Sequence, residues 1–200
     1  MRTKTPIKYN YIKKYHITHP TYLEKSVSDF LRAFQSRQLP TKKHAPLFFP
    51  AIYATQDNTK KSNVVEITMI VIDIDSKIHS LAFPRRCDIN PTWLQRTFFA
   101  YTTFSHTNES PRWRMVIPLE KPISAEIWAR KGWKRSVEIF GEMMGIDNPE
   151  KIVDSTCKNQ NRGYYYPSHP LGANPRELIS IGSIYDLDPD TIPEPPPPPK

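Results

Sequence analysis

The segment 64–77, VVEITMIVIDIDSK, ends an apolar run with two carboxylates, Asp73 and Asp75. Its β-branched residues predict a buried strand. Alternate side chains of a strand face the same way, so both carboxylates would share one face, roughly 7 Å apart. Such a pair repels unless a cation lies between its members, and Mg²⁺ takes oxygen ligands of this kind. The alternative is a strand that ends at Asp73 and leaves both acids in solvent, because Asp is common in turns.

A second group of charged side chains follows in residues 101–119, YTTFSHTNESPRWRMVIPL. His106 comes at the end of one strand pattern, and Arg112 and Arg114 share one face of the next. Histidine and arginine donate to phosphate oxygens, and arginine does so bidentately. Arg112 has a plainer interpretation, which we favour for it here: a solvated charge of the turn.

A third group lies in residues 152–170, IVDSTCKNQNRGYYYPSHP, which contain Asp154 and Arg162. From its position alone, Asp154 is better explained as a loop acid or a helix cap than as a metal ligand. The three tyrosines that follow Arg162 alternate across a predicted strand, so at least one of them belongs to the core.

Composition limits the class of protein. With 38% hydrophobic and 24% charged residues in 200, the chain is typical of a soluble globular domain or a compact pair of subdomains. Its net charge of +8 favours a polyanionic partner such as nucleic acid, although merely soluble proteins are also basic. Cys87 and Cys157 lack a His/Cys cluster, so we expect no structural zinc and reduced thiols.

The sequence has neither a signal-peptide core nor an apolar run long enough to span a membrane, which predicts a cytoplasmic protein without a membrane partner. A P-loop motif is absent too, so this chain carries no P-loop helicase of its own.

The hydrophobic pattern predicts a mixture of helices and strands. Apolar residues at helical spacing predict a helix within 20–37, and Ser124 and Gly145 bound a longer helix over 124–145. Strand patterns occupy 47–55, 64–75, 99–107, 112–123, 162–167 and 177–187, and the third and fourth of these should form an antiparallel hairpin. The order favours an α+β fold with a mixed or antiparallel sheet and flanking helices.

Taken in order, the three charged segments resemble the archaeo-eukaryotic primase superfamily, in particular the primase-polymerase domains of plasmid and phage replication proteins. The resemblance covers about residues 47–170. It implies an RRM-like catalytic core over about 46–185, within a catalytic domain of residues 1–185 whose first part, about 1–45, would be helical. The proline-rich residues 186–200 would be a linker or tail in extended polyproline conformation.

The same resemblance implies the site residues and their partners. Asp73, Asp75 and Asp154 would bind two Mg²⁺ or Mn²⁺ ions, and His106 would join them as a catalytic residue. The expected nucleotide-binding residues are His106, Arg114, Arg162 and Ser105. The expected function is template-dependent DNA primase or polymerase activity, with single-stranded DNA and NTPs or dNTPs as substrates. A helicase, on the same or a separate chain, and a bacterial or archaeal host cytoplasm are also implied.

Two other functions fit parts of this pattern. A replication-initiator nickase would cut DNA with a tyrosine, and Tyr164, Tyr165 and Tyr166 are the candidates. A non-catalytic DNA-binding module would depend on the basic charge alone. The proline-rich end leads us to expect that these 200 residues are the N-terminal part of a longer replication protein.

Overall fold

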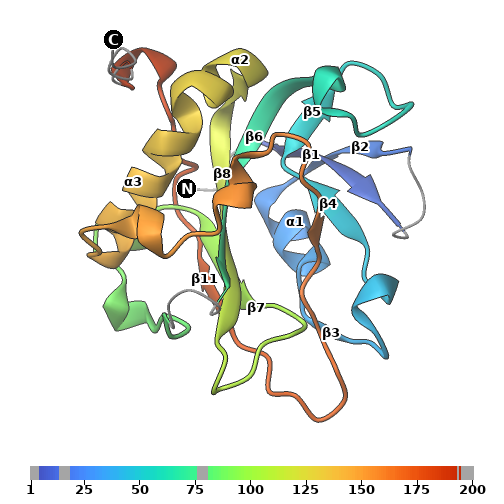
Figure 1. Cartoon of the computed structure of the whole chain (residues 1–200), viewed down its shortest axis with the longest axis vertical. Coiled ribbons are helices and arrows are strands. Elements are labelled where there is room, and N and C mark those ends of the chain that lie inside the picture. Colours follow the sequence, from blue (N-terminus) through green and yellow to red (C-terminus); the bar gives the residue numbers. More distant parts are fainter. Residues whose placement is uncertain (1–4, 14–18, 76–80, 193, 195–200) are drawn as a thin grey trace.

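A five-stranded antiparallel sheet forms the centre of the molecule (Figure 1). The computed structural model describes residues 5–13, 19–75, 81–192 and 194. Among these, the sheet has the strand order β11-β7-β8-β6-β5. The bounds are Ala51–Tyr53 for β5, Val64–Asp75 for β6, Phe98–Thr102 for β7, Arg112–Ser124 for β8 and Glu177–Ser180 for β11. The predicted hairpin is confirmed as the pairing of β7 with β8.

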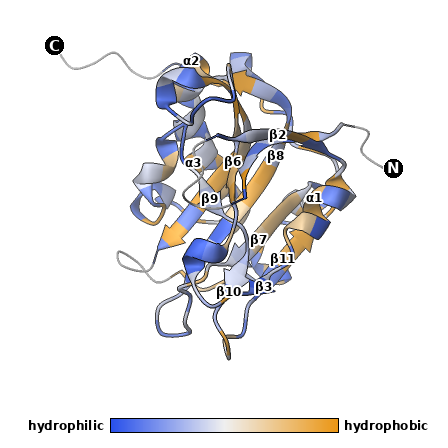
Figure 2. Cartoon of the chain, turned by 90° about the vertical axis from the view of Figure 1, so that its right-hand side faces the viewer, coloured by the Kyte–Doolittle hydropathy of each residue, from blue (hydrophilic) through white to orange (hydrophobic). Residues whose placement is uncertain are grey.

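Strand β6 is buried on both faces, which explains its almost uninterrupted apolar sequence. Ile70, Ile72 and Ile74 belong to one hydrophobic cluster, while Met69 and Val71 belong to a second cluster on the other face. Figure 2 shows the central strands as largely hydrophobic. Because side chains alternate along a strand, Asp73 extends from the same face as Met69 and Val71.

The face of β6 that carries Ile70, Ile72 and Ile74 packs against the long helical segment predicted for 124–145. This segment consists of α2 (Ala125–Ile127), a π-helical turn (Trp128–Gly132) and α3 (Trp133–Met144). Ser124 caps its start, since its Oγ accepts from the Ile127 backbone N at 3.3 Å. Gly145 ends it with φ +65°, a left-handed conformation that glycine adopts without strain.

The other face of the central sheet is covered by the N-terminal region, which corrects the expectation of a helical part over about 1–45. Here the described residues form a second sheet, β2-β1-β4-β9, with one seven-residue helix, α1 (Val27–Ala33). The strands are β1 (Ile7–Ile12), β2 (Thr21–Lys25), β4 (Leu47–Phe49) and β9 (Tyr164–Tyr165). Residues 21–25 have apolar spacing compatible with a helix, but they pair with β1 along its length, and Ser26 begins α1 only after them.

The remaining elements are short. β3 (Arg37–Gln38) pairs in parallel with β10 (Ser168–His169). Brief 3₁₀-helices occur at Lys42–His44, Lys61–Asn63, Arg86–Asp88, Trp93–Gln95, Pro149–Lys151, Ser155–Lys158 and Pro189–Thr191. The fold is therefore α+β with antiparallel sheets and few helices, as predicted. Within the described ranges, no helix is long and apolar enough to cross a membrane. Of the predicted tail, residues 186–200, seven residues (193 and 195–200) lie outside the described ranges. The described part corrects the expectation of an extended tail, because Pro189–Thr191 form a 3₁₀-helix and Leu187 and Ile192 are buried in the hydrophobic core.

Candidate active site

The pairing of β6 with β8 places two carboxylates opposite two arginines. In the antiparallel register Asp73 faces Arg114, and Asp75 faces Arg112. Arg114 Nη2 donates to Asp73 Oδ2 at 2.9 Å, and both side chains are buried. Arg112 Nε lies 3.2 Å from Asp75 Oδ1, an ion pair without hydrogen-bond geometry. The interpretation of Arg112 as a solvated turn charge was therefore wrong, because it lies in β8 with its side chain 26% exposed.

Asp154 comes from a distant segment and lies beside Asp73. Its backbone N donates to the Asp73 carbonyl O at 2.9 Å, and the preceding Val153 forms a β-bridge with Ile74. Its side chain also caps the 3₁₀-helix Ser155–Lys158, since Asp154 Oδ1 accepts from the backbone N and Oγ1 of Thr156 at 2.9 and 2.7 Å. Although burial opposes ionisation, these hydrogen bonds and Arg162 lower the pKa of Asp154. Asp154 is thus both a helix cap and a site residue.

Arg162 joins the two carboxylates. Its Nη1 donates to Asp154 Oδ2 at 3.0 Å and its Nη2 to Asp73 Oδ2 at 3.1 Å. Arg114 bonds to that same oxygen, Asp73 Oδ2. Among the described residues, the hydrogen bonds to the Asp73 carboxylate all fall on Oδ2 and none falls on Oδ1.

Aromatic residues contact both Arg114 and Arg162. Arg114 Nη1 donates to Tyr101 Oη at 2.9 Å and to the Tyr165 carbonyl O at 3.2 Å. The guanidinium carbons of Arg114 and Arg162 lie 4.8 and 5.3 Å from the centroid of the Tyr164 ring, within cation–π range. Burial opposes the charge of Arg114, but Asp73 and Tyr101 outweigh it and raise the Arg114 pKa. The arginine is therefore held in place as a permanent cation.

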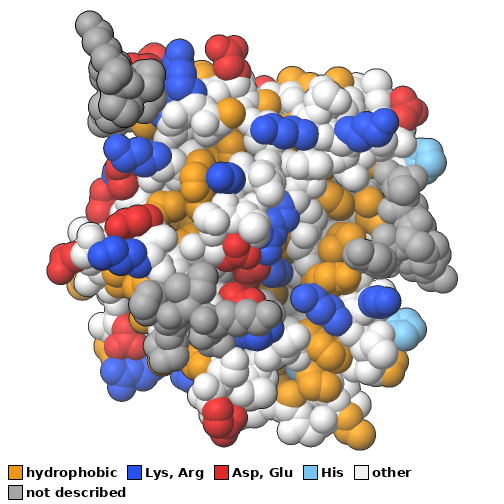
Figure 3. Space-filling view, viewed as in Figure 1, with side chains coloured by type: hydrophobic (Ala, Val, Ile, Leu, Met, Phe, Trp, Pro, Cys, Tyr) orange, Lys and Arg blue, Asp and Glu red, His pale blue; other side chains and the backbone are white. Residues whose placement is uncertain are grey.

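The carboxylates and arginines described above line a small polar pocket of about 170 Å³, namely Asp73, Asp75, Arg112, Arg114, Asp154 and Arg162. Its remaining walls are Lys42, Ile74, Thr103, Ser105, Gly163 and Tyr165. Lys42 Nζ lies 4.9 Å above the Tyr165 ring, and burial and then Arg114 lower the Lys42 pKa. Acidic and basic side chains lie side by side near the centre of the face in Figure 3. The pocket holds three carboxylates, three arginines and one lysine, so it has one more basic than acidic side chain.

Ser105 and His106 belong to the turn after β7, because the strand ends at Thr102 and is shorter than predicted. Ser105 lines the pocket, whereas His106 stands just outside its wall. His106 Nδ1 accepts from the Arg112 backbone N at 3.1 Å. Burial and then Arg176 lower the His106 pKa, which favours the neutral imidazole. Because Nδ1 accepts a hydrogen bond, the proton of the neutral ring is on Nε2.

A divalent cation fits the oxygen atoms of this pocket. One ligand atom each from Asp73, Asp154 and Cys157 lies within 4.8 Å of the others. Burial raises the pKa of the Cys157 thiol to about 11, which leaves the carboxylates as the ionised donors. Two carboxylates suit a hard ion such as Mg²⁺ or Mn²⁺. Asp75 stands apart from this group, with its side chain 41% exposed.

The structure adds residues that the sequence pattern did not indicate, namely Lys42, Tyr101 and Cys157. Lys42 comes from the polar segment TKKHAP, which carries no recognisable motif, and it reaches the site because its 3₁₀-helix directly precedes β4. Tyr101 and Cys157 read as core residues, and both are buried.

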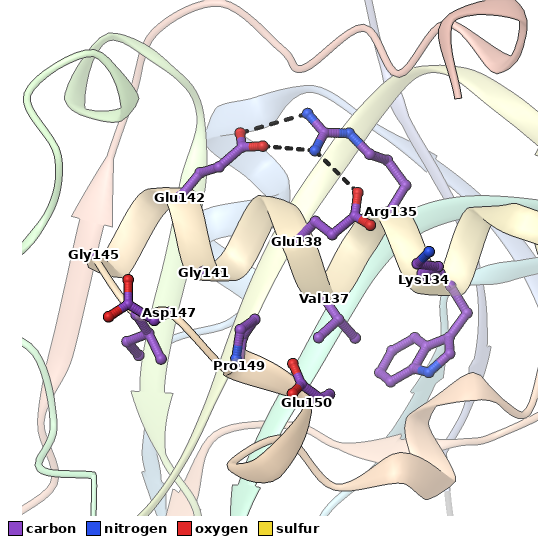
Figure 4. Close-up of a pocket in the computed structure, with 12 residues that line it drawn as sticks. Lys134, Arg135, Val137, Glu138, Gly141, Glu142, Gly145, Asp147, Pro149 and Glu150 are labelled. Carbon is purple, nitrogen blue, oxygen red and sulfur yellow. Dashed lines mark hydrogen bonds and ion pairs between the residues drawn. The ribbon is translucent and has the colours of Figure 1, made fainter. Parts of the chain in front are cut away.

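A larger pocket lies elsewhere, along α3 (Figure 4). It measures about 760 Å³ and carries four carboxylates: Glu138, Glu142, Asp147 and Glu150. Arg135 is paired with Glu138 and Glu142 at 3.4 and 2.6 Å. We take the smaller pocket as the candidate active site, because carboxylates and cations from four separate segments meet there.

Comparison with known proteins identifies a family. The family described as VapE N-terminal domain matches residues 16–192. No curated protein matches the chain. Among solved structures, the chain is similar to the AEP domain of the cyanophage S-2L primase-polymerase, with 11% identity and a TM-score of 0.46, over 92% of this chain and 86% of that one.

Proposed function

The chain belongs to the VapE N-terminal domain family, and we propose that it is a template-dependent nucleotidyltransferase, a DNA primase or polymerase. The observation that carries this proposal is the meeting of Asp73 and Asp154 with Arg114, Arg162 and Lys42 in one polar pocket. Carboxylates provide for a metal ion, and the cations provide for a polyphosphate. Few substrates other than a metal-bound nucleoside triphosphate use both sets of groups.

Asp73, Asp75 and Asp154 would hold two divalent ions, Mg²⁺ or Mn²⁺, which when bound activate a 3′-hydroxyl and neutralise the leaving pyrophosphate. Arg114 and Arg162 orient the triphosphate through paired N–H donors, as arginine does with phosphates. Ser105 donates from the pocket wall, and His106 donates from Nε2. These groups align the reacting atoms, and alignment supplies much of the rate in such reactions.

Arg162 has to exchange partners during this cycle. In the structure it neutralises Asp73 and Asp154, the two carboxylates closest to each other. A nucleotide that arrives with its cation offers phosphate oxygens to the arginine and a positive charge to the carboxylates. The ion pairs of Arg162 with Asp73 and Asp154 thus hold the two carboxylates in place.

The test is primer synthesis on single-stranded DNA with Mg²⁺ or Mn²⁺. Asp73→Asn and Asp154→Asn should each abolish product, because an amide cannot replace an anionic metal ligand. Addition of a chelator should do the same to the wild type. Asp147→Asn, which removes a carboxylate from the α3 pocket, is the matched control and should leave synthesis unchanged.

Asp73 is buried against two arginines, so thermal melting must show that each variant is folded. Asp75→Asn supplies an independent test at a more exposed position. Full synthesis by folded Asp73→Asn and Asp154→Asn proteins would refute the proposal.

The alternative function, DNA nicking, requires an accessible tyrosine. Tyr164 is 2% exposed and Tyr166 is 7% exposed, and burial raises the pKa of both. Tyr165 is half-buried and is the candidate that remains. A covalent DNA adduct that disappears in Tyr165→Phe would favour the nickase over the polymerase.

The cellular setting is proposed from the resemblance. We place the protein in the cytoplasm of a bacterial or archaeal host, in replication of a plasmid, phage or other mobile element. A helicase, on the same or a separate chain, would supply the single-stranded template. The RRM-like description of the catalytic core belongs to the same proposal.

A further inference from the structure

A second pocket lies on the other side of β9 from the acidic pocket. It measures about 220 Å³ and is lined mainly by β1, the segment 33–39 and residues 45, 46, 166 and 167. Tyr9 and Tyr166 form its floor, and the two hydroxyl groups are 3.1 Å apart. Tyr11 forms a half-buried wall, and its ring is held edge-on to Tyr166 with centroids 5.8 Å apart. The pocket is therefore a rigid aromatic site and not a loose surface depression.

The charged side chains that line this pocket are both basic. They are Lys25, at the end of β2, and Arg37, in β3. No Asp or Glu is among the described residues of its wall. The pocket along α3 is the opposite case, with four carboxylates. An aromatic floor with a purely cationic rim is complementary to a base attached to a phosphate backbone.

At two places in the sequence, residues that line the acidic pocket are followed closely by residues that line the aromatic one. Tyr165 lines the acidic pocket and the next residue, Tyr166, lines the aromatic one. Lys42 likewise lines the acidic pocket, and Ala45 and Pro46 line the aromatic one. The two pockets are therefore built from the same two chain segments, residues 42–46 and 165–166.

We propose that the aromatic pocket binds an unpaired base of single-stranded DNA, which positions the template beside the acidic pocket. Tyr11 provides the stacking face, Gln35 offers an amide to a base edge, and Lys25 and Arg37 contact the flanking phosphates. The inference rests on the proposed polymerase function and adds to it a template subsite.

The experiment measures binding of a fluorescent single-stranded oligonucleotide to the full chain by anisotropy, without metal or nucleotide. Tyr11→Leu should weaken binding about tenfold, because one stacked base is lost. The double variant Lys25→Gln/Arg37→Gln should reduce the slope of log K against log salt by about 1.4, as expected for two phosphate contacts on a single strand. Lys121→Gln, which removes an exposed charge from β8 outside both pockets, should change neither quantity.

An oligonucleotide of equal length with abasic sites separates stacking from charge. It should bind Tyr11→Leu and the wild type equally well, whereas the double variant should still bind it less tightly. Unchanged affinity of folded Tyr11→Leu for the normal oligonucleotide, or an equal loss for the abasic one, would overturn the subsite. Because the assay contains no metal, loss of synthesis in Asp73→Asn together with normal DNA binding by Tyr11→Leu would refute the subsite alone. Normal synthesis by Asp73→Asn would instead refute the polymerase function.

Discussion

Asp73 shows how one residue can serve both folding and function. Its Oδ2 accepts from Arg114 and Arg162, and its backbone carbonyl accepts from Asp154 N. A carboxylate with 12% of its side chain exposed needs such partners, because a buried unpaired charge is very costly. The arginines that stabilise Asp73 are also the groups that would bind phosphate when a metal ion takes their place at the carboxylate.

At the same scale, His106 should titrate below the ordinary histidine value. Burial and then Arg176 lower its pKa, and protonation of Nδ1 would break the hydrogen bond from Arg112 N. The folded protein thus binds this proton less readily than the unfolded chain does. This difference in pKa contributes to the free energy of unfolding. The contribution is fully present above the unfolded pKa of about 6.5 and decreases as the pH falls toward the folded pKa.

NMR titration of the imidazole signals measures the pKa of His106. The His106 signal is the one that disappears in His106→Gln. The midpoint should lie below about 6.5, the ordinary value. A midpoint at or above that value would contradict the lowered pKa of His106.

At the scale of elements, the approach of β9 to β4 determines where Arg162 lies. A Cβ added at Gly163 would come within 2.7 Å of Cε1 and Cζ of Phe49, which is buried in β4. Gly163→Ala should therefore displace Arg162 or Phe49 and lower both primer synthesis and the free energy of unfolding, the latter by about 1–3 kcal/mol.

Gly145→Ala is the matched control for Gly163→Ala. At Gly145 a Cβ meets nothing within 4 Å, so the cost is only that of the left-handed conformation, roughly 1 kcal/mol. Urea unfolding and the synthesis assay together distinguish Gly163→Ala from Gly145→Ala. Equal activity of both folded alanine variants would mean that the position of Arg162 does not depend on this contact.

The elements near the site were largely predictable, and those that bring distant residues to it were not. Alternation along 64–75 correctly indicated that Asp73 and Asp75 extend from one face, and the Ser124 and Gly145 signals bounded the long helix. The β1–β2 hairpin was missed because apolar spacing over 20–37 fits a helix as well. Only the pairing of residues 21–25 with β1 distinguishes a strand from a helix there.

Contacts between distant segments explain what the sequence did not show about the site. Sequence alone does not state that Arg112 stands opposite Asp75, or that the bridge from Val153 to Ile74 brings Asp154 to Asp73. Lys42 has no motif at all, and its place follows from β4 pairing with β9. In each case the missing information is a contact between segments far apart in the chain.

At the scale of the whole molecule, Arg114 connects the two sheets through the site. From β8 in the central sheet it bonds to Asp73 in β6 and Tyr101 in β7, and it also bonds to the Tyr165 carbonyl in β9 of the second sheet. Tyr101 Oη donates to the same carbonyl at 2.9 Å. The geometry of the site and the packing of the two sheets therefore depend on one another.

Arg114→Met should accordingly lower the free energy of unfolding by about 3–5 kcal/mol, the usual cost of leaving one member of a buried ion pair without its partner. Arg112→Met provides the control, because Arg112 lies two residues away on the same face and pairs with the more exposed Asp75. It should cost under about 1 kcal/mol, as exposed pairs do. Urea unfolding at pH 7 measures both. Similar losses in the two variants would mean that Arg114 does not join the sheets, and that the site could be altered without loosening the fold.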